Sequence, residues 1–306
     1  MTLDILAYGE AMVEFNQRVH DARMYLQGFG GDTSNFCIAA ARQGARSGYI
    51  SALGNDHFGD KLRALWQDEK VDASHVASDA SAATGVYFVS HDRDGHHFDY
   101  LRAGSAASRY SSAQLPLAAI AAVKVLHLSG ISLAISASAC DAGLAAMAHA
   151  RKHGVKTSLD TNLRLKLWPL ERAREKMRAA FALCDICLPS WDDISALTGL
   201  DERDAIVDEL LSYGIGLIAF KLGAEGCYVA TAKERRLVPP FSVEAIDATG
   251  AGDCFGGAFI ARIVAGDDPF RAARYANVCA ALSTTGYGAV APIPQARQVE
   301  EILGSA

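Results

Sequence analysis

The amino-acid sequence predicts an α/β fold: a doubly wound, mostly parallel sheet flanked by helices, with a second and smaller β-sheet. Strand-like apolar runs alternate with helical stretches along most of the 306 residues, which is the pattern of repeated βαβ units. This alternation is interrupted by strand-like runs at 84–89 and 97–101, joined by Asp92-Arg93-Asp94-Gly95, a sequence typical of a hairpin turn. We expect this hairpin and the non-helical stretch 16–29 to form a small sheet of their own.

Each element of the main sheet is expected from the local pattern of apolar residues. The first strand, 3–15, is broken by Gly9-Glu10, and the first helix follows the cap candidates in 30–35 and stops at Gly44. Further strands are expected at 46–53, 123–128, 156–159, 185–188 and 217–221, with a hairpin at 226–240. Further helices are expected at 57–70, 138–152, 170–183, within 192–213, at 252–265, at 270–285 and from about 295 onward. The core would then comprise 1–15, 30–83 and 102–306, and the small sheet 16–29 and 84–101.

The composition is that of an ordinary globular protein, with 50% hydrophobic and 21% charged residues. The net charge of −6 argues against non-specific nucleic-acid binding but not against an anionic substrate held by a few local arginines. No secretory signal is visible, and the most apolar window, 115–140, contains Lys124 and His127, so we expect no membrane span. Seven cysteines, an odd number, favour reduced thiols and a cytoplasmic location. We interpret Cys184 and Cys187 as buried strand residues rather than a zinc site.

One glycine-rich stretch, Asp247-Ala248-Thr249-Gly250-Ala251-Gly252-Asp253, precedes an apolar run at helical spacing. Glycines remove Cβ atoms where a ligand must approach the backbone, and the first turn of a helix carries unpaired N–H groups that bind anions. A carboxylate at Asp253 would repel a bound phosphate, a cost that makes sense if it accepts a proton from an attacking hydroxyl. The alternative is a plain helix cap with an acidic first turn.

Three polar segments follow three different predicted strands: Asp160, Pro189-Ser190 and Lys221-Leu222-Gly223. Ligands of doubly wound sheets bind beyond the carboxyl ends of the strands, so we expect these segments to face one crevice. The two common nucleotide signatures, GxxxxGK[ST] and GxGxxG, are absent. The sequence therefore disfavours a P-loop or a Rossmann dinucleotide site.

Two motifs, Gly30-Gly31-Asp32-Thr33-Ser34-Asn35 and the stretch 247–253, resemble the paired signatures of ribokinase-like (PfkB) sugar kinases. The resemblance covers essentially the whole chain. It implies a ribokinase-like fold and ATP-dependent phosphorylation of a sugar hydroxyl, with the small sheet as a lid that excludes water. The N–H groups of Gly250, Ala251 and Gly252 would form the anion hole for the transferred phosphate, and Asp253 would be the base.

The same resemblance implies contacts with ATP from Asn162, Arg164, Ser190, Lys221, Gly223, Gly226, Thr249, Gly250, Gly252 and Asn277. For Asn277 the alternative is a solvated helix residue. Mg²⁺ is expected with ATP, held by phosphates and water. No residue is assigned as a direct metal ligand, because Ser190-Trp191-Asp192-Asp193 stands where the family often has Asn-x-x-Glu. The resemblance also implies a homo-oligomer, with the lid as the surface through which two copies would pair.

Three stretches bear on the sugar, at 31–35, 100–108 and 160–168, and together they resemble the 2-keto-3-deoxygluconate kinases within this family. A guanidinium binds a carboxylate through two parallel hydrogen bonds, so an arginine on the lid is the expected site for a sugar acid. Arg164 could serve either ligand. The hydroxyls of the lid tyrosines could reach the sugar, or the rings could simply pack. The substrate contacts implied by the resemblance are Gly31, Asp32, Asn35, Tyr87, Tyr100, Arg102, Arg164 and the base Asp253.

The expected reaction transfers the γ-phosphoryl group of ATP to the 6-hydroxyl of 2-keto-3-deoxygluconate, and an aldolase would cleave the product. A fructokinase or another neutral-sugar kinase shares the ATP-site residues but leaves the lid arginine unexplained. A non-catalytic sugar or nucleotide sensor on the same fold is the more distant alternative, because it would be expected to lose the base or the glycines.

Overall fold

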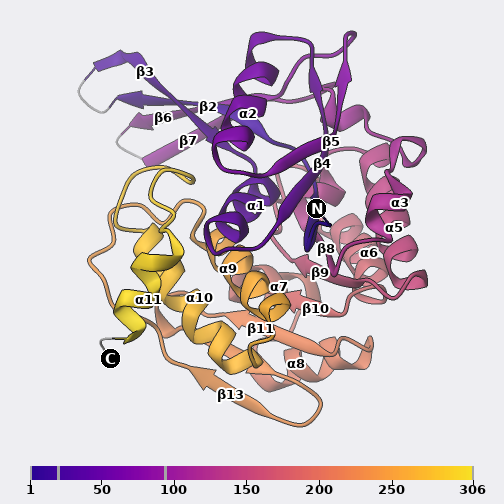
Figure 1. Cartoon of the computed structure of the whole chain (residues 1–306), viewed down its shortest axis with the longest axis vertical. Coiled ribbons are helices and arrows are strands. Elements are labelled where there is room, and N and C mark those ends of the chain that lie inside the picture. Colours follow the sequence, from indigo (N-terminus) through magenta and orange to yellow (C-terminus); the bar gives the residue numbers. More distant parts are fainter. Residues whose placement is uncertain (1, 19–20, 93–94, 305–306) are drawn as a thin grey trace.

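The computed structural model describes residues 2–18, 21–92 and 95–304. Within them, the strands are β1 (Ile5–Tyr8), β2 (Met12–Arg18), β3 (Asp21–Gly30), β4 (Ser47–Gly54), β5 (Asp72–Asp79), β6 (Val86–Asp92), β7 (Gly95–Leu101), β8 (Val125–Ser129), β9 (Lys156–Asp160), β10 (Ile186–Leu188), β11 (Leu217–Lys221), β12 (Cys227–Ala230) and β13 (Arg235–Val238). They form a large sheet in the order β13-β12-β11-β10-β9-β8-β1-β4-β5 and a small one in the order β3-β2-β6-β7 (Figure 1).

The strands of the large sheet run parallel from β5 to β11, and β12 and β13 continue it as an antiparallel hairpin. The sheet is flanked by α1 (Asp32–Arg42), α2 (His57–Asp68), α3 (Leu117–Ile120), α4 (Gly130–Ala134), α5 (Ala137–Lys152), α6 (Leu170–Phe181), α7 (Trp191–Thr198), α8 (Arg203–Ser212), α9 (Ala251–Ala265), α10 (Pro269–Ser283) and α11 (Ala296–Gly304). The predicted doubly wound, mostly parallel sheet is confirmed.

Two hydrophobic cores cover the two faces of the large sheet. Successive side chains of a strand point to opposite faces, and in β1 Ile5 and Ala7 enter one core whereas Leu6 and Tyr8 enter the other. The first core packs against α1, α2, α9, α10 and α11, and the second against α5, α6, α7 and α8. Because the strands of the large sheet bury side chains on both of its faces, their sequences are continuous apolar runs.

Helices α1 and α9 pack closely because small residues face each other between them. A Cβ added to Gly257 of α9 would lie 2.4 Å from the carbonyl oxygen of Phe36 in α1. This contact brings the start of α1, which follows Gly31, next to the start of α9, which follows Gly250. The two glycine-rich motifs, far apart in the sequence, therefore lie together.

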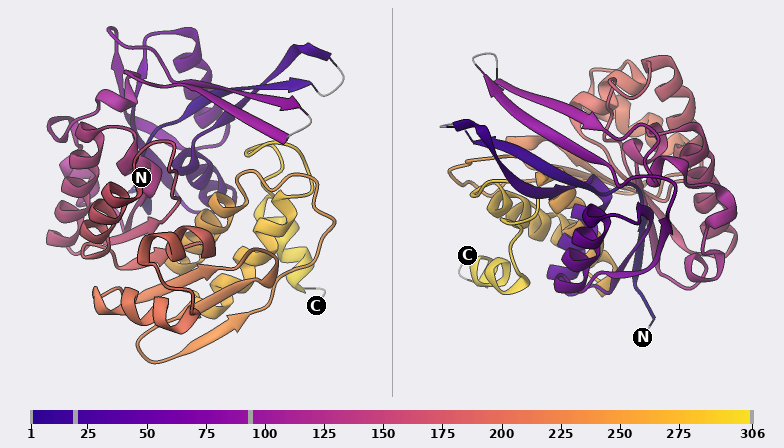
Figure 2. Two further views of the ribbon diagram at one scale, coloured as in Figure 1. Left: turned by 180° about the vertical axis from the view of Figure 1, so that it is seen from behind. Right: turned by 90° about the horizontal axis from the view of Figure 1, so that it is seen from above.

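The small sheet stands out from the helical body (Figure 2), and its first strand begins earlier than expected. β2 pairs with β3 from Met12 onward and with β6 from Val13 onward, so residues 12–15 belong to the small sheet and not to the core. The chain leaves the large sheet at Gly9-Glu10, where the sequence predicted only a break within one strand. Residues Arg93 and Asp94 of the expected hairpin turn lie outside the described residues, although the flanking strands β6 and β7 pair as predicted.

β5 was not expected from the sequence. It lies at the edge of the large sheet, pairs with β4 alone, and buries only Val76 among polar neighbours, so its pattern lacks the apolar run of an internal strand. All seven cysteines are buried and free of disulfides. Over the described residues, no helix is both long and apolar enough to cross a bilayer.

Candidate active site

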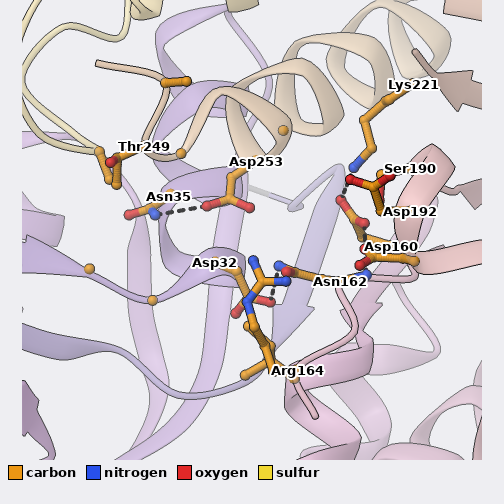
Figure 3. Close-up of a pocket in the computed structure, with 18 of the residues that line it drawn as sticks. Asp32, Asn35, Asp160, Asn162, Arg164, Ser190, Asp192, Lys221, Thr249 and Asp253 are labelled. Atoms are coloured by element: carbon orange, nitrogen blue, oxygen red, sulfur yellow. Dashed lines mark hydrogen bonds and ion pairs between the residues drawn. The ribbon is translucent and has the colours of Figure 1, made fainter. Parts of the chain in front are cut away.

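A cavity of about 1220 Å³ opens where the parallel strands end, between the start of α9 and the small sheet (Figure 3). Asp160 ends β9, Ser190 follows β10, and Lys221 ends β11; all three line this cavity, as the strand order predicts. On the opposite wall, the small sheet contributes Met12, Tyr87, Phe98 and Tyr100. The small sheet is therefore one wall of the site.

The start of α9 forms one end of the cavity and is suited to hold an anion. Gly250 has φ +75°, and a Cβ there would lie 2.9 Å from the Cβ of Ala289, so only glycine fits. No side chain caps this helix, which leaves its first N–H groups to a ligand. The expected set is corrected at one position: the N–H of Ala251 donates to the carbonyl of Ala248 at 3.2 Å, so it is already engaged. Gly252 lines the cavity together with Thr249 and Gly250.

Asp253 lies in the first turn of α9 and faces the same space. Its Oδ2 accepts a hydrogen bond of 2.9 Å from the side-chain amide of Asn35 (Figure 3). Burial raises the pKa of Asp253 well above its usual range, and the nearby carboxylates of Asp32 and Asp160 raise it further, against the opposing effects of Asn35 and Lys221. A carboxylate with a raised pKa beside an anion-binding helix end is suited to accept a proton from a hydroxyl.

Polar atoms without partners mark the place for a polyhydroxylated ligand. Asp32 accepts a 3.0 Å hydrogen bond at Oδ2 from the amide of Asn162, a residue held at φ +28°. Oδ1 of Asp32 and Oδ1 of Asn35 are buried, and among the described residues neither has a hydrogen-bond partner. Buried acceptors without donors are costly, so both atoms fit hydroxyl groups of a bound ligand. Gly31 lines the cavity beside them, at φ +117°.

Arg102 lies in the cavity wall and already pairs with a carboxylate of the chain, although its Nη2 is buried and has no hydrogen-bond partner among the described residues, so its contact with a sugar acid stays a prediction. Its Nε donates to Oε2 of Glu10 at 2.7 Å, and the side chains of Arg102 and Glu10 are 11% and 0% exposed. Ser105 donates to the other oxygen of Glu10. The sequence analysis missed Glu10 as a residue of the site, although Gly9-Glu10 had marked an interruption in the strand. The carboxylate of Glu10 forms an ion pair with Arg102 in the absence of any ligand.

We expect Arg102→Met to destabilise the protein by about 3–5 kcal/mol, because it would leave the carboxylate of Glu10 buried without its counter-ion. Urea unfolding of the variant and the wild type measures the difference. The double variant Glu10→Gln/Arg102→Met should recover most of the loss, since both charges are then removed. Equal stability of Arg102→Met and wild type would mean that the pair does not form in solution.

Arg164 differs from Arg102 in having no carboxylate partner among the residues that the structure describes. Its side chain is exposed and lines the cavity, and its Nη1 donates to the carbonyl of Leu163 at 2.8 Å. Among the described residues it forms no ion pair. Figure 3 shows its side chain in the same cavity as Asp32 and Asn162. The cation best placed to meet a ligand carboxylate is therefore Arg164.

The two lid tyrosines are neighbours in the small sheet. Tyr87 and Tyr100 are paired across β6 and β7, and their rings stack with centroids 5.6 Å apart. The hydroxyl of Tyr87 donates to Glu14, a buried carboxyl group whose pKa burial raises, so Tyr87 serves as a packed wall. Tyr100 is 39% exposed and is the tyrosine whose hydroxyl remains accessible to a ligand.

The expected nucleotide contacts divide into two groups. Gly223, at φ +58°, lines the cavity with Lys221 and Ser190. Gly226 and Asn277 are not among the lining residues. A Cβ at Gly226 would lie 2.4 Å from the carbonyl oxygen of Val238, and the amide of Asn277 donates to the carbonyls of Val238 and Pro239. Both residues hold the chain that follows β13. Asn277 is buried, so the solvated alternative for it is wrong, while contact of Gly226 and Asn277 with the nucleotide stays a prediction.

The glycine-rich helix start, the Asp253 carboxylate and the two-sheet architecture occur together in a chain that matches one known family over nearly its whole length. The family described as pfkB family carbohydrate kinase matches residues 2–296. The chain belongs to that family. Its fold is accordingly ribokinase-like, and its reaction is the phosphorylation of an alcohol group of a sugar.

Relatives within the pfkB family differ in their sugar. Fructokinase-1 of Oryza sativa subsp. japonica is 34% identical over 319 residues, spanning 99% of this chain and 98% of the relative. The 2-dehydro-3-deoxygluconokinase of Thermoproteus tenax is 32% identical over 315 residues, spanning 98% and 94%. A putative ribokinase II from E. coli, solved in complex with ATP and Mg²⁺, is 27% identical with a TM-score of 0.92 and full coverage of both chains. The choice of sugar must therefore come from the cavity.

Proposed function

We propose that this pfkB-family kinase transfers the γ-phosphoryl group of ATP to the 6-hydroxyl of 2-keto-3-deoxygluconate. One observation carries the choice of substrate: Arg164 presents a guanidinium to the cavity with no ion-pair partner among the described residues. A sugar acid brings a carboxylate that this side chain binds through two hydrogen bonds. A neutral sugar offers it no such group.

The chemistry follows from the position of Asp253. The sugar hydroxyl loses its proton to Asp253 as its oxygen bonds to the γ-phosphorus. The bond from that phosphorus to the oxygen bridging to the β-phosphate breaks, and the electron pair leaves with ADP. The free N–H groups at the start of α9 are placed to carry the negative charge that develops on the phosphoryl oxygens. Asp32, Asn35 and Asn162 would hold the sugar hydroxyls, and Ser190, Gly223 and Thr249 would contact ATP.

The acid-rich nucleotide side of the cavity fits ATP carrying a divalent metal. Asp160, Asp192 and Asp193 line this region and would repel bare phosphates. The described residues contain no group of three or more His, Cys, Asp and Glu side chains arranged to hold a metal ion. We infer that Mg²⁺ is held mostly through the phosphates and water, as is usual for this ion beside ATP, where it neutralises phosphate charge.

Fructose is the second candidate substrate, and two observations favour it. The rice fructokinase is 34% identical to this chain. In addition, Glu10 neutralises Arg102, so the lid arginine no longer requires a substrate carboxylate. The two candidates share every group proposed to act on the phosphate, and they differ at Arg164.

ADP release with 2-keto-3-deoxygluconate, fructose and ribose separates these substrates. We expect kcat/KM for 2-keto-3-deoxygluconate to exceed that for fructose by at least about tenfold, the effect of one charged hydrogen-bonding contact. A clear preference for fructose would overturn the substrate proposal while retaining the kinase. The absence of turnover with any sugar would instead favour the sensor alternative.

Three further expectations stay proposals. We infer that residues 12–30 and 86–101 act as a lid over the sugar. Copies of the chain would pair through this lid, whose exposed apolar side chains Met24, Leu26 and Leu101 support the idea, and the molecular mass in solution tests it. Seven free, buried thiols support a reducing compartment such as the cytoplasm.

A further inference from the structure

We infer that Lys221 is a catalytic residue that contacts the transferred phosphoryl group, and that Asp160 is the residue that positions it. The sequence resemblance had placed Lys221 among general contacts with ATP. The inference rests on the proposed phosphoryl transfer but is independent of which sugar accepts the group.

The backbone and the side chain of Lys221 are both held in place. Lys221 ends β11, its N–H donates to the carbonyl of Pro189 at 2.8 Å, and it forms a parallel bridge with Ser190. Its ammonium pairs with Oδ2 of Asp160, which ends β9 on the other side of β10. The side chains of Lys221 and Asp160 are 13% and 7% exposed, so this pair is shielded from screening by solvent.

The ammonium lies at the anion-binding end of α9. A Cβ built on Gly252 would be 3.5 Å from Nζ of Lys221, and Nζ is the nearest atom that it would meet. A phosphoryl oxygen accepting from the N–H of Gly252 would therefore lie within reach of the lysine. An ammonium has three donors, and the pair with Asp160 uses one of them. The structure leaves donors of Lys221 for the phosphoryl group.

The charges around this point explain why a fixed cation is needed. Burial raises the pKa of Asp160 even with Lys221 beside it, and the carboxylates of Asp193 and Asp32 raise it further. Asp253 has a raised pKa for the same reasons. The cavity thus carries excess negative charge, and the phosphoryl group adds to this charge during its transfer. Lys221 is the lining cation that lies beside Gly252.

The neighbouring segment 190–193 does not neutralise this negative charge. Ser190 is the N-cap residue of α7 and is neutral. Oδ2 of Asp193 accepts from the hydroxyl of Thr161 at 3.3 Å, so this carboxylate is turned toward β9. Neither residue brings a positive charge to the transferred group, whereas Lys221 holds its ammonium beside Gly252. Removal of one donor to a developing oxyanion costs about 10²–10³ in kcat.

Lys221→Met tests the contact in two independent ways. We expect kcat to fall by about 10²–10³-fold on the best sugar of the panel. We also expect binding of AMP-PNP with Mg²⁺ to weaken by about tenfold, measured by calorimetry, whereas ADP binding changes little, because only AMP-PNP carries a γ-phosphoryl group. The matched control is Lys233→Met, which removes an exposed lysine in the turn after β12.

Two outcomes would overturn the inference. If AMP-PNP and ADP binding weakened equally, Lys221 would contact the inner phosphates or the nucleoside. If kcat were unchanged, Lys221 would make no contact that matters for catalysis. If Lys221→Met fails to fold by circular dichroism, Lys221→Arg keeps the charge while changing the donor geometry, and it should retain ADP binding but lose kcat. An inactive wild type would defeat the proposed function, yet the comparison of AMP-PNP with ADP would still test the contact.

The positioning role of Asp160 requires a double-mutant cycle. Asp160→Asn should lower kcat and the ratio of AMP-PNP to ADP affinity in the wild-type background, because the ammonium loses the group that holds it. In the Lys221→Met background, the same substitution should leave that ratio unchanged. A loss of the same size in both backgrounds would show that Asp160 acts by another route.

Discussion

Replacement of Asp253 by asparagine should lower kcat by about 10²–10⁴-fold, which is the usual contribution of a positioned general base. The amide keeps the size of the carboxylate but cannot accept the hydroxyl proton. Because burial and the neighbouring carboxylates raise the pKa of Asp253, the charged form is unfavourable in the folded protein, and Asp253→Asn should not lower the thermal midpoint. ADP release and a thermal melt measure the two effects.

Asp68→Asn is the matched control for this prediction. Asp68 ends α2, is exposed, and does not line the cavity, so its substitution should leave kcat within about twofold. Sugar and AMP-PNP should still bind to Asp253→Asn, as judged by calorimetry. Near-normal turnover of Asp253→Asn would mean that another group takes the proton, and loss of both ligands would indicate a binding role instead.

Replacement of Arg164 by alanine should raise the KM for 2-keto-3-deoxygluconate by about 10–100-fold, since a hydrogen bond to a charged group contributes roughly 1.5–3 kcal/mol. The effect should fall on the sugar because Arg164 has no ion-pair partner among the described residues and lines the cavity with Asp32 and Asn162 (Figure 3). Arg164→Lys should recover only part of the loss, because an ammonium lacks the planar fork. Steady-state kinetics with each substrate varied in turn provide the measurement.

Lys166→Ala controls for a general effect of positive charge in the cavity. Lys166 is exposed and also lines the cavity, two positions along the chain from Arg164. Its loss should alter the KM for the sugar acid much less. A rise in the KM for ATP with an unchanged KM for the sugar would reassign Arg164 to the nucleotide, and it would remove the main support for a sugar-acid substrate.

The elements that could be predicted from the sequence share a local or topological cause. Gly250, Gly252 and Asp253 mark a helix start by their order in the chain, because N–H groups of a first turn have no partners within the helix. Asp160, Ser190 and Lys221 meet because parallel strands end at one edge of a sheet, whatever their side chains. By contrast, β5 escaped prediction because an edge strand needs no apolar run.

The sequence by itself therefore determined the fold class, the glycine-rich start of α9 and the position of the Asp253 carboxylate in its first turn. The partners of the charged and polar side chains were decided only by the tertiary structure. Glu10 and Arg102 are 92 residues apart, Glu14 and Tyr87 are 73 apart, and Asp160 and Lys221 are 61 apart. A buried charge must be paired, but several candidates exist along the chain, and packing selects among them. That selection pairs Arg102 with Glu10, leaves Arg164 without an ion-pair partner among the described residues, and brings the ammonium of Lys221 beside Asp160 and Gly252.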